Sequence, residues 1–497
     1  MQQMMHSFTA TKAPPDILAA LEKGTISSFC LFANLNTENP AQVRELCETL
    51  RFAAAKGGNP PPLIGIDQEG GQLIAITGGA TELPGNMALG ATGSRELAEK
   101  AGRLLARELL AMGINMNFAP SLDVNINPAN PVIGLRAFGD TPALVSELGI
   151  SMIHGMQSEG MIATAKHFPG HGDTGADTHH GDAIIPYDID RINQVELAPF
   201  RAAVQYGVSA IMSAHIRVTA LDPDHPATIS REILTNLLRH KMGYDGLIVT
   251  DAMDMWAVAR HGKEESIQAA LSAGADLILL GHIKGQMDLM SKFKEDAASV
   301  ARIRAVREHL STTLPSFDVI GCAEHQAIAR EIAEASITRV KGNTRLSLPA
   351  DSHILVITPY PENLTPADTS AQVKIRLAEA ISKRHLHTTH LQMPMGAADI
   401  PAIVNVAESA DTVIVGTINA YRDATQVALV NELRARGKHP IVIALRAPYD
   451  LVEFPMIDDY LCTYGIRPVS MEAVTRVLFG EIEAQGVLPC AIPEMRF

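Results

Sequence analysis

The sequence of 497 residues has few aromatic side chains and no long apolar run. Aromatic residues make up 4% of the chain and include a single tryptophan, Trp256. The chain therefore lacks the several stacking surfaces that enzymes sliding along a polysaccharide usually present. No apolar run approaches the length of a membrane span, and Met1–His6 is not a basic segment followed by an apolar stretch. We therefore expect a cytoplasmic protein with no membrane partner.

Cysteine and positive charge are also scarce. The five cysteines are odd in number and widely scattered, which indicates reduced thiols and not a disulfide framework. Lysine and arginine number 41 against 55 aspartate and glutamate residues, so the formal net charge is -14. Because phosphate groups attract basic surfaces, this balance argues against nucleic acid or an anionic membrane as a partner.

Hydrophobic residues make up 46% of the chain, which is enough for a large core. Short apolar strands alternate with amphipathic helical patterns through the first 310 residues. The candidate strands are Gln3–Phe8, Ile26–Ala33, Leu63–Asp67, Asn115–Pro120, Gly160–His167, Ala210–His215, Gly246–Asp251 and Asp276–Leu280. The helical patterns are Pro40–Ala55, Ser94–Leu110, Leu144–Glu159, Arg191–Tyr206, Ser230–His240 and Lys263–Ala273. This alternation predicts an α/β protein that begins with a TIM (β/α)8 barrel.

A second α/β unit follows a break in the pattern at residues 312–322. A connecting helix is expected over Glu324–Val340. The candidate strands after it are His353–Thr358, His385–His390, Thr412–Gly416, Pro440–Ala444 and Asp459–Thr463. The candidate helices are Ser370–Lys383, Ile400–Ser409, Ala424–Arg436 and Met471–Phe479. We predict a barrel over residues 1–312, a linker and helix over 313–340, and an α/β/α sandwich over 341–497.

Polar residues gather at the carboxyl ends of the barrel strands. They are Asp67, Asp123, Lys166, His167, His215 and Asp251. A strand that is buried on both faces should not carry such residues unless its end opens onto a shared pocket. The carboxyl ends of barrel strands are also where enzymes of this fold hold their catalytic groups. The sequence therefore predicts an active site at this end of the barrel.

The segment Lys166–His180 places a lysine, four histidines and two aspartates in a turn rich in glycine. One interpretation is a polar loop without function. A second is a zinc or manganese site, although the histidine spacing is poor and Lys166 would repel a cation. The third is an acid/base pair of Asp177 and His179 on a loop over a sugar pocket.

Asp251 follows the apolar strand Gly246–Thr250 directly. A carboxylate at the tip of a buried strand can be held rigidly, as a glycosidic nucleophile must be. Asp251 could instead cap the helix that follows, as aspartate often does. Asp254, which we expect in the first turn of that helix, suits the capping role better.

Several motifs together resemble glycoside hydrolase family 3, and in particular its β-N-acetylglucosaminidase branch. They are Lys166–Thr174 with Asp177-Thr-His179, Asp67–Gly71, Asn130–Gly139, Val249-Thr250-Asp251 and, in the second unit, Pro468–Ala473 and Leu478–Pro489. The resemblance implies a retaining reaction in which Asp251 attacks the anomeric carbon and forms a covalent glycosyl-enzyme. It implies that His179 is the acid/base and that Asp177 orients its ring.

The residues that the resemblance assigns to sugar hydroxyls are Asp67, Arg136, Lys166 and His167. The implied activity is removal of terminal N-acetylglucosamine from muropeptides or chitooligosaccharides, so the expected partner is a small carbohydrate. No cofactor and no metal are implied, and no oligomeric state is predicted. Gln72 and Ala75 depart from the family pattern, in which these two places commonly hold arginine. The sequence therefore does not indicate which residues bind the sugar hydroxyls on that side.

Three alternatives remain at this point. A phosphorylase could use the same residues, since a neutral histidine acid/base lets an anionic phosphate approach where a carboxylate would repel it. A β-glucosidase is a variant in sugar preference. A non-catalytic sugar-binding or metal-dependent protein belongs to another class, which turnover and resistance to EDTA would exclude.

Overall fold

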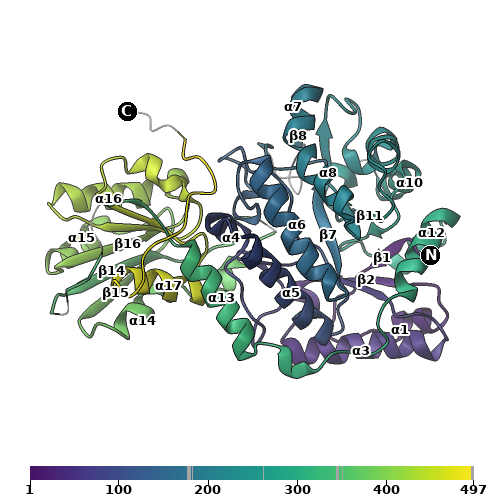
Figure 1. Cartoon of the computed structure of the whole chain (residues 1–497), viewed down its shortest axis with the longest axis horizontal. Helices are drawn as coiled ribbons and strands as arrows, with labels where there is room; N and C mark the ends of the chain where they lie inside the picture. Colours follow the sequence, from purple (N-terminus) through teal and green to yellow (C-terminus); the bar gives the residue numbers. More distant parts are fainter. Residues whose placement is uncertain are drawn as a thin grey trace.

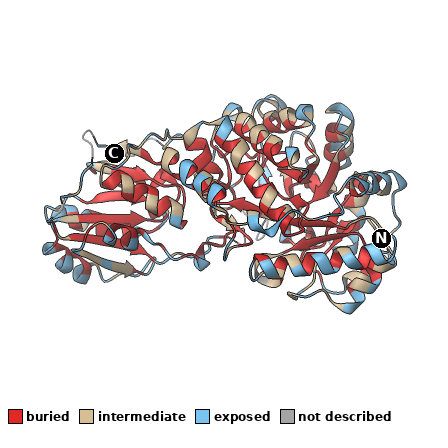
Figure 2. Ribbon diagram, turned by 60° about the horizontal axis from the view of Figure 1, so that its bottom comes forward, coloured by how far each residue is buried: buried red, intermediate tan, exposed pale blue. Residues whose placement is uncertain are grey.

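The computed structural model describes residues 1–175, 181, 183–260, 262–342, 346–349, 351–365 and 367–493. Two α/β units lie side by side, and each is built around its own sheet (Figure 1). The helix α13 (Ala323–Ser336) connects them and packs against α4 (Asn86–Thr92) and α5 (Arg95–Ala111) of the first unit and α17 (Pro468–Leu478) of the second. In both units the strands are buried and the outer helix faces are exposed (Figure 2).

The first sheet has eight parallel strands that form a nearly closed barrel. They are β1 (Met4–His6), β2 (Ser28–Leu31), β3 (Leu63–Ile66), β6 (Met116–Asn117), β7 (Ile162–Phe168), β9 (Ala210–Ser213), β11 (Leu247–Thr250) and β12 (Ile278–Leu279). Their spatial order is β11-β9-β7-β6-β3-β2-β1-β12, and a parallel bridge between Val249 and Leu277 joins its two ends. All eight strands lie within or next to the ranges predicted from the sequence.

The barrel interior is filled by apolar side chains that alternate along the strands. They include Met5, Cys30, Leu63, Met116, Phe118, Ile162, Met212, Leu247, Val249 and Leu279. Gly65 of β3 leaves room for the ring of Phe118, because a Cβ at residue 65 would lie 2.5 Å from that ring. Since the interior is packed, a ligand can bind only at an end of the barrel.

Helices surround the barrel on its outside. They include α1 (Pro15–Glu22), α3 (Pro40–Lys56), α5, α6 (Pro142–Ser158), α8 (Leu197–Tyr206), α10 (Lys263–Ala273) and α12 (Ala297–Glu308). The predicted start of α3 has a physical cause, because the side chain of Asn39 accepts the N–H of Gln42 and Pro40 occupies the first turn. Ser94 caps α5 in the same way through the N–H of Leu97.

The helix predicted over Arg191–Tyr206 is wrong, because the structure has two helices there. They are α7 (Ile189–Gln194) and α8, separated by Val195 and Glu196. Pro199 explains the break, since a proline ring clashes with the carbonyl of the residue four positions earlier in a continuous helix. That residue is Val195, the C-cap at which α7 ends.

The second sheet has six strands in the order β13-β18-β17-β16-β14-β15. They are β13 (Thr338–Lys341), β14 (Ile354–Pro359), β15 (Thr388–Met393), β16 (Thr412–Thr417), β17 (Ile441–Ala444) and β18 (Asp459–Cys462). Only β13 is antiparallel to its neighbour. Side chains of β14 alternate between two apolar clusters, so both faces of the sheet are covered. The covering helices include α14 (Leu377–Ser382), α15 (Ile400–Glu408), α16 (Ala424–Ala435) and α17.

Two helix predictions in the second unit are wrong in extent. The helix expected to reach Val340 ends at Ser336, and β13 follows it. The β-branched residues Ile337, Thr338 and Val340 favour a strand, and β18 supplies the pairing partner. The helix expected over Ser370–Lys383 becomes a short 3-10 turn, Ser370–Gln372, followed by α14. The extended residues between them bury Val373 and Ile375 in the sheet core. The domain bounds given above stay a prediction.

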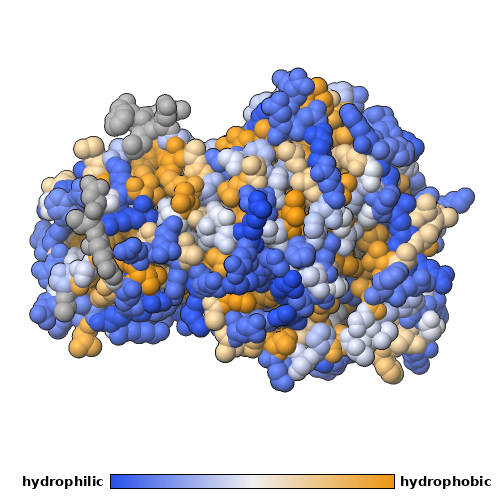
Figure 3. Space-filling model, in the orientation of Figure 1, coloured by the Kyte–Doolittle hydropathy of each residue, from blue (hydrophilic) through white to orange (hydrophobic). Residues whose placement is uncertain are grey.

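The surface mixes hydrophilic and hydrophobic side chains in small patches on the face shown in Figure 3. Within the described ranges, no helix is both long and apolar enough to cross a lipid bilayer. All five cysteines are free thiols, and only Cys322 is not buried.

Candidate active site

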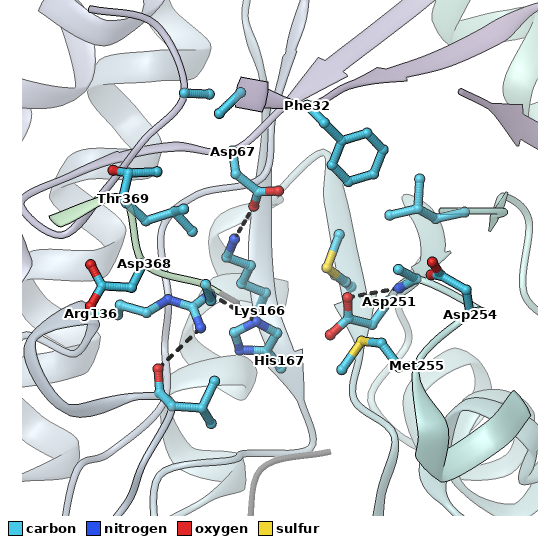
Figure 4. Close-up of a pocket in the computed structure, with 18 of the residues that line it drawn as sticks. Phe32, Asp67, Arg136, Lys166, His167, Asp251, Asp254, Met255, Asp368 and Thr369 are labelled. Carbon is cyan, nitrogen blue, oxygen red and sulfur yellow. Dashed lines mark hydrogen bonds and ion pairs between the residues drawn. The ribbon is translucent and has the colours of Figure 1, made fainter. Parts of the chain in front are cut away.

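A cavity of about 610 Å³ opens at the carboxyl ends of the barrel strands. Its lining includes five residues predicted from the sequence: Asp67, Arg136, Lys166, His167 and Asp251. Figure 4 shows Arg136 on one side, Asp251 on the other, and Lys166 and His167 between them. The structure therefore brings the predicted nucleophile and the predicted hydroxyl-binding residues to one cavity.

Asp251 lies immediately after β11, as expected. Its backbone N–H donates to the carbonyl of Ser213 at 3.1 Å, and its Oδ1 accepts the N–H of Ala252 at 2.8 Å. These bonds fix the carboxylate at the strand end while the residue stays only partly buried. A carboxylate held in this way can approach a ligand in the cavity without rearranging the backbone.

His215 supports the backbone next to Asp251 and is not among the cavity-lining residues. Its Nδ1 lies 2.8 Å from Oγ1 of Thr228, and its Nε2 lies 2.9 Å from the carbonyl of Ala252. The imidazole therefore ties the residue after Asp251 to a neighbouring loop. Its position at a strand end reflects this structural task.

Lys166 lies between two carboxylates. Its ammonium is 2.5 Å from Oδ1 of Asp67 and 2.5 Å from Oε1 of Glu69. Asp67 follows β3 and is 31% exposed in its side chain, whereas Glu69 of the strand β4 (Gln68–Gly70) is 1% exposed. The partly exposed Asp67 can thus contact a ligand, whereas the buried Glu69 holds the ammonium of Lys166 in position.

Arg136 shares Glu69 with Lys166. Its Nη2 and Nε donate to the Glu69 carboxylate at 2.8 and 3.0 Å. The same Nη2 lies 3.2 Å from Nε2 of His167. Arg136 belongs to a short 3-10 turn, Gly134–Arg136, which follows β6 by a long loop. Glu69 therefore fixes both cations that face the cavity.

Asp123 holds the two histidines next to this cluster. Its carboxylate accepts from Nδ1 of His167 at 2.7 Å and from the backbone N–H of His171 at 2.6 Å. Ser121 donates to the same carboxylate at 2.9 Å. Asp123 is fully buried. It fixes the orientation of the His167 ring and the start of the loop that follows β7.

Lys166 and His167 are consecutive, yet both line the cavity. Successive side chains of a regular strand point to opposite faces. The pairing of β7 with β9 shifts register between Ala165 and Phe168, so the strand is irregular at Lys166 and His167. This irregularity lets two neighbouring side chains face the same cavity.

The electrostatics of the cluster keep Glu69 and Lys166 charged and His171 neutral. Burial alone would raise the pKa of Glu69, but Arg136 and Lys166 lower it to about 2. Burial opposes the charge on Lys166, yet Asp67 and Glu69 raise its pKa above the usual value. Burial lowers the pKa of His171 to about 4, so this ring is neutral at pH 7.

The predicted acid/base pair, Asp177 and His179, lies outside the described residues. The described beginning of this loop is well anchored. Asp173 accepts from Nη2 of Arg191 at 3.1 Å, and Oγ1 of Thr174 lies 2.8 Å from Nδ1 of His171. His171 and Asp173 thus hold the start of this loop in place.

One expectation near Asp251 is wrong. Asp254 does not cap a helix, because its Oδ2 accepts the backbone N–H of His282 at 2.8 Å and the next helix, α9 (Trp256–Ala259), begins after Met255. Trp256, the first residue of α9, is 43% exposed, and its ring lies 4.8 Å from the guanidinium of Arg260. Trp256 is also not among the residues that line the cavity.

The second unit contributes to the cavity, which the sequence did not predict. Its lining residues are Asn363, Ala367, Asp368 and Thr369. Gln72 is hydrogen-bonded to this segment of the second unit, since its backbone carbonyl accepts the N–H of Thr369 at 2.8 Å. Ala75 lines the cavity with a small side chain. The two departures from the expected arginine pattern therefore lie next to a wall from the second unit.

Glu69 was missed as a working part of the site, and Asp123 was expected at a strand end without a role. Both are buried acids. Glu69 pairs with Arg136 and Lys166, and Asp123 accepts from the ring of His167 and from the backbone N–H of His171. The presence of Glu69 inside the motif Asp67–Gly71 was the available signal. Among the described residues, no group of three or more His, Cys, Asp and Glu side chains is placed to hold a metal ion.

Comparison with known proteins identifies the family. The Glycosyl hydrolase family 3 N terminal domain matches residues 2–312. The chain belongs to glycoside hydrolase family 3. A Beta-hexosaminidase A from Pseudoalteromonas piscicida is 31% identical, with 97% of this chain and 92% of that protein covered. Family 3 membership confirms the resemblance described above and makes the chain a glycoside hydrolase.

Two further family 3 relatives cover different shares of the chain. A Beta-hexosaminidase from Thiobacillus denitrificans is 36% identical over 62% of this chain and 86% of its own length. A solved glycoside hydrolase family 3 beta-N-acetylglucosaminidase from Paenibacillus sp. str. FPU-7 is 36% identical, with a TM-score of 0.91 and coverage of 99% of this chain and 98% of that one. The likeness to this last protein extends over both units.

Proposed function

We propose that this chain is a retaining, exo-acting β-N-acetylglucosaminidase. It removes terminal N-acetylglucosamine from short glycans such as muropeptides or chitooligosaccharides. The observation that best supports this proposal is the position of the Asp251 carboxylate across one cavity from Asp67, Arg136, Lys166 and His167. The names of the relatives, β-hexosaminidase and β-N-acetylglucosaminidase, favour an N-acetylhexosamine as the sugar.

In the first step, the Asp251 carboxylate forms a bond to the anomeric carbon while the bond from that carbon to the leaving oxygen breaks. His179 gives the leaving oxygen its proton, and Asp177 orients the imidazole. In the second step, His179 takes a proton from water, the water oxygen bonds to the anomeric carbon, and the ester to Asp251 breaks. Two inversions leave the anomeric configuration unchanged.

Sugar hydroxyls meet a rigid set of donors and acceptors in this scheme. Asp67 accepts, and Arg136 and Lys166 donate, from positions that buried ion pairs already fix. Because the charges are oriented before the sugar binds, little reorganisation accompanies binding. This set favours one sugar ring in one orientation, which suits an exo-acting enzyme.

We also propose the cytoplasm as the location and the ranges 1–312, 313–340 and 341–497 as the domain bounds. Five free thiols, four of them buried, fit a reducing compartment.

A panel of p-nitrophenyl β-glycosides tests the proposed activity. The panel contains the N-acetylglucosaminide, the N-acetylgalactosaminide and the glucoside, each assayed with and without EDTA. We expect the N-acetylglucosaminide to have the highest kcat/KM and EDTA to have no effect. Turnover of none of the three would support a sugar-binding protein instead, and preference for the glucoside would make the chain a β-glucosidase.

A further inference from the structure

One wall of the cavity comes from a segment that lies about 300 residues after the barrel loop it touches. The wall residues are Asn363, Ala367, Asp368 and Thr369. Thr369 joins this segment to the barrel, because its N–H and its hydroxyl both donate to the carbonyl of Gln72, at 2.8 and 2.9 Å. The side chain of Gln72 donates in turn to the carbonyl of Ala367 at 3.2 Å. The wall is therefore bonded to Gln72 of the barrel through both Ala367 and Thr369.

Arg446 of the second unit locks the wall from behind. Its Nη1 donates to Oδ2 of Asp368 at 2.9 Å and to Oγ of Ser370 at 2.8 Å, and its Nη2 donates to Oε1 of Gln72 at 2.7 Å. The side chain of Asp368 is fully buried, and that of Arg446 is 5% exposed. One guanidinium thus joins the wall, its own unit and the barrel.

Arg467 adds a second lock. Its Nε donates to the carbonyl of Gly71 at 2.7 Å, and its Nη2 donates to Oγ1 of Thr369 at 3.2 Å. An ion pair with Glu82 at 3.0 Å holds the same guanidinium against the barrel. With two buried arginines behind it, the wall has a fixed position relative to the barrel.

The wall lies on the side of the cavity away from the proposed nucleophile. In Figure 4, Asp368 and Thr369 are beside Arg136, and Asp251 is on the far side. In a pyranose ring the anomeric carbon and C4 are opposite each other. A sugar with its anomeric carbon at Asp251 therefore directs C4 and its hydroxyl toward Arg136 and the wall.

We propose that the wall residues determine substrate specificity by excluding a second sugar from the C4 hydroxyl. This inference rests on the proposed function and names the feature that makes the enzyme act on chain ends. The wall also offers one donor. Oδ1 of Asn363 accepts the N–H of Ala371 at 2.7 Å, which directs the amide NH2 outward from an exposed side chain. We infer that this NH2 donates a hydrogen bond to a hydroxyl oxygen of the bound sugar.

Four variants test the inference. Asn363→Ala removes the amide, and Glu362→Ala is its control, an exposed neighbour that does not line the cavity. Arg446→Met removes the lock. Arg422→Met is the matched control, because Arg422 also joins the two units, through the carbonyl of Ala129 at 2.6 Å, and does not line the cavity. Melting temperatures show which variants fold.

Two substrates separate the possible results. With p-nitrophenyl N-acetylglucosaminide, Asn363→Ala should raise KM about three- to tenfold, the loss expected for one hydrogen bond, with kcat little changed. Arg446→Met should raise KM by a similar or larger factor. With p-nitrophenyl chitobioside, the wild type should release N-acetylglucosamine first, whereas Arg446→Met should also release the intact disaccharide. Both controls should behave as the wild type.

The inference is wrong if Asn363→Ala and a folded Arg446→Met keep the wild-type KM and release no disaccharide. If Arg446→Met does not fold, the exposed Asn363 decides the amide contact by itself. A wild type that cleaves neither substrate contradicts the proposed function. A wild type that cleaves both, with unchanged variants, contradicts only the inference about the wall.

Discussion

The ammonium of Lys166 lies 2.5 Å from the carboxylate of Glu69, and each side chain is 1% exposed. The same carboxylate holds Arg136, so one buried acid orients both cations that face the cavity. Removing one partner of a buried ion pair is strongly destabilising, because the remaining charge has lost its compensation. Glu69 is therefore a positioning residue, and its loss should affect both sugar binding and stability.

Glu69→Gln should lower the free energy of unfolding at pH 7 by on the order of 3 kcal/mol. The pKa of Glu69 is lowered from 4.5 to about 2 in the folded protein. Its ionic contribution is thus complete above pH 4.5 and is lost as the pH falls through 2. The difference between wild type and variant should shrink over this window, as urea unfolding at several pH values would measure. A difference that stays constant from pH 7 to pH 2.5 would show that the charge of Glu69 is not its cause.

The surface ion pair of Arg44 and Glu48 gives the control variant Glu48→Gln, whose free energy of unfolding should differ little from that of the wild type.

Asp251→Asn should reduce kcat for the p-nitrophenyl glycoside by about a thousandfold or more, with the melting temperature nearly unchanged. A 2-fluoro or 5-fluoro glycosyl inhibitor should label Asp251, and mass spectrometry of the digested protein would locate the label. Asp254→Asn is the control. The Asp254 carboxylate accepts the backbone N–H of His282, so the inhibitor should still label Asp251 in this variant. Label on Asp254 would overturn the assignment.

His179→Ala should slow the hydrolysis of substrates with poor leaving groups far more than that of activated aryl glycosides. An aryloxide leaves without a proton, whereas the oxygen of a second sugar needs one. Comparing kcat/KM for chitobiose and for the p-nitrophenyl glycoside measures the difference. Asp177→Asn should have a milder effect and shift the pH profile, since the imidazole loses an orienting anion. Equal losses on both substrates would give His179 a binding role only.

Millimolar phosphate should leave the products unchanged. The described part of the cavity places its two cations, Lys166 and Arg136, in ion pairs with Asp67 and Glu69, so neither offers an uncompensated charge to a second anion. We therefore expect free N-acetylglucosamine at every phosphate concentration, measured by chromatography. Formation of N-acetylglucosamine 1-phosphate together with a rise in total turnover would make the enzyme a phosphorylase.

The sequence predicted the barrel and four of the five cavity residues because both depend on local patterns, whereas Arg136 came only from the resemblance to family 3. An apolar strand that ends in a charged residue is visible within ten positions, and the fold then collects all such ends at one place. The wall residues had no such signal. Their contacts with Gln72 join residues that are 295 to 297 positions apart. Only the packing of one unit against the other determines that proximity.

The errors in helix extent arose where a local pattern was present but did not decide the structure. Arg191–Tyr206 and Ser370–Lys383 both have helical apolar spacing, but a local or tertiary preference outweighed it. In the first case Pro199 cannot continue a helix from Val195. In the second, Val373 and Ile375 fill the sheet core only when the backbone is extended. The spacing of apolar residues gave the right class of structure and the wrong extent.

The contacts of Arg446 and Arg467 also form late in the synthesis of a new chain. These arginines bond to Gln72 and Gly71, which precede them by 374 and 396 residues. A ribosome adds about 5 to 20 residues per second, so the roughly 150 residues from the end of the barrel to Arg467 take on the order of 10 to 30 seconds. During that interval the nascent barrel already carries Asp251 and its cations, but one side of its cavity is open. We expect a chain stalled on the ribosome just after the barrel to bind sugars loosely and without regard to chain ends.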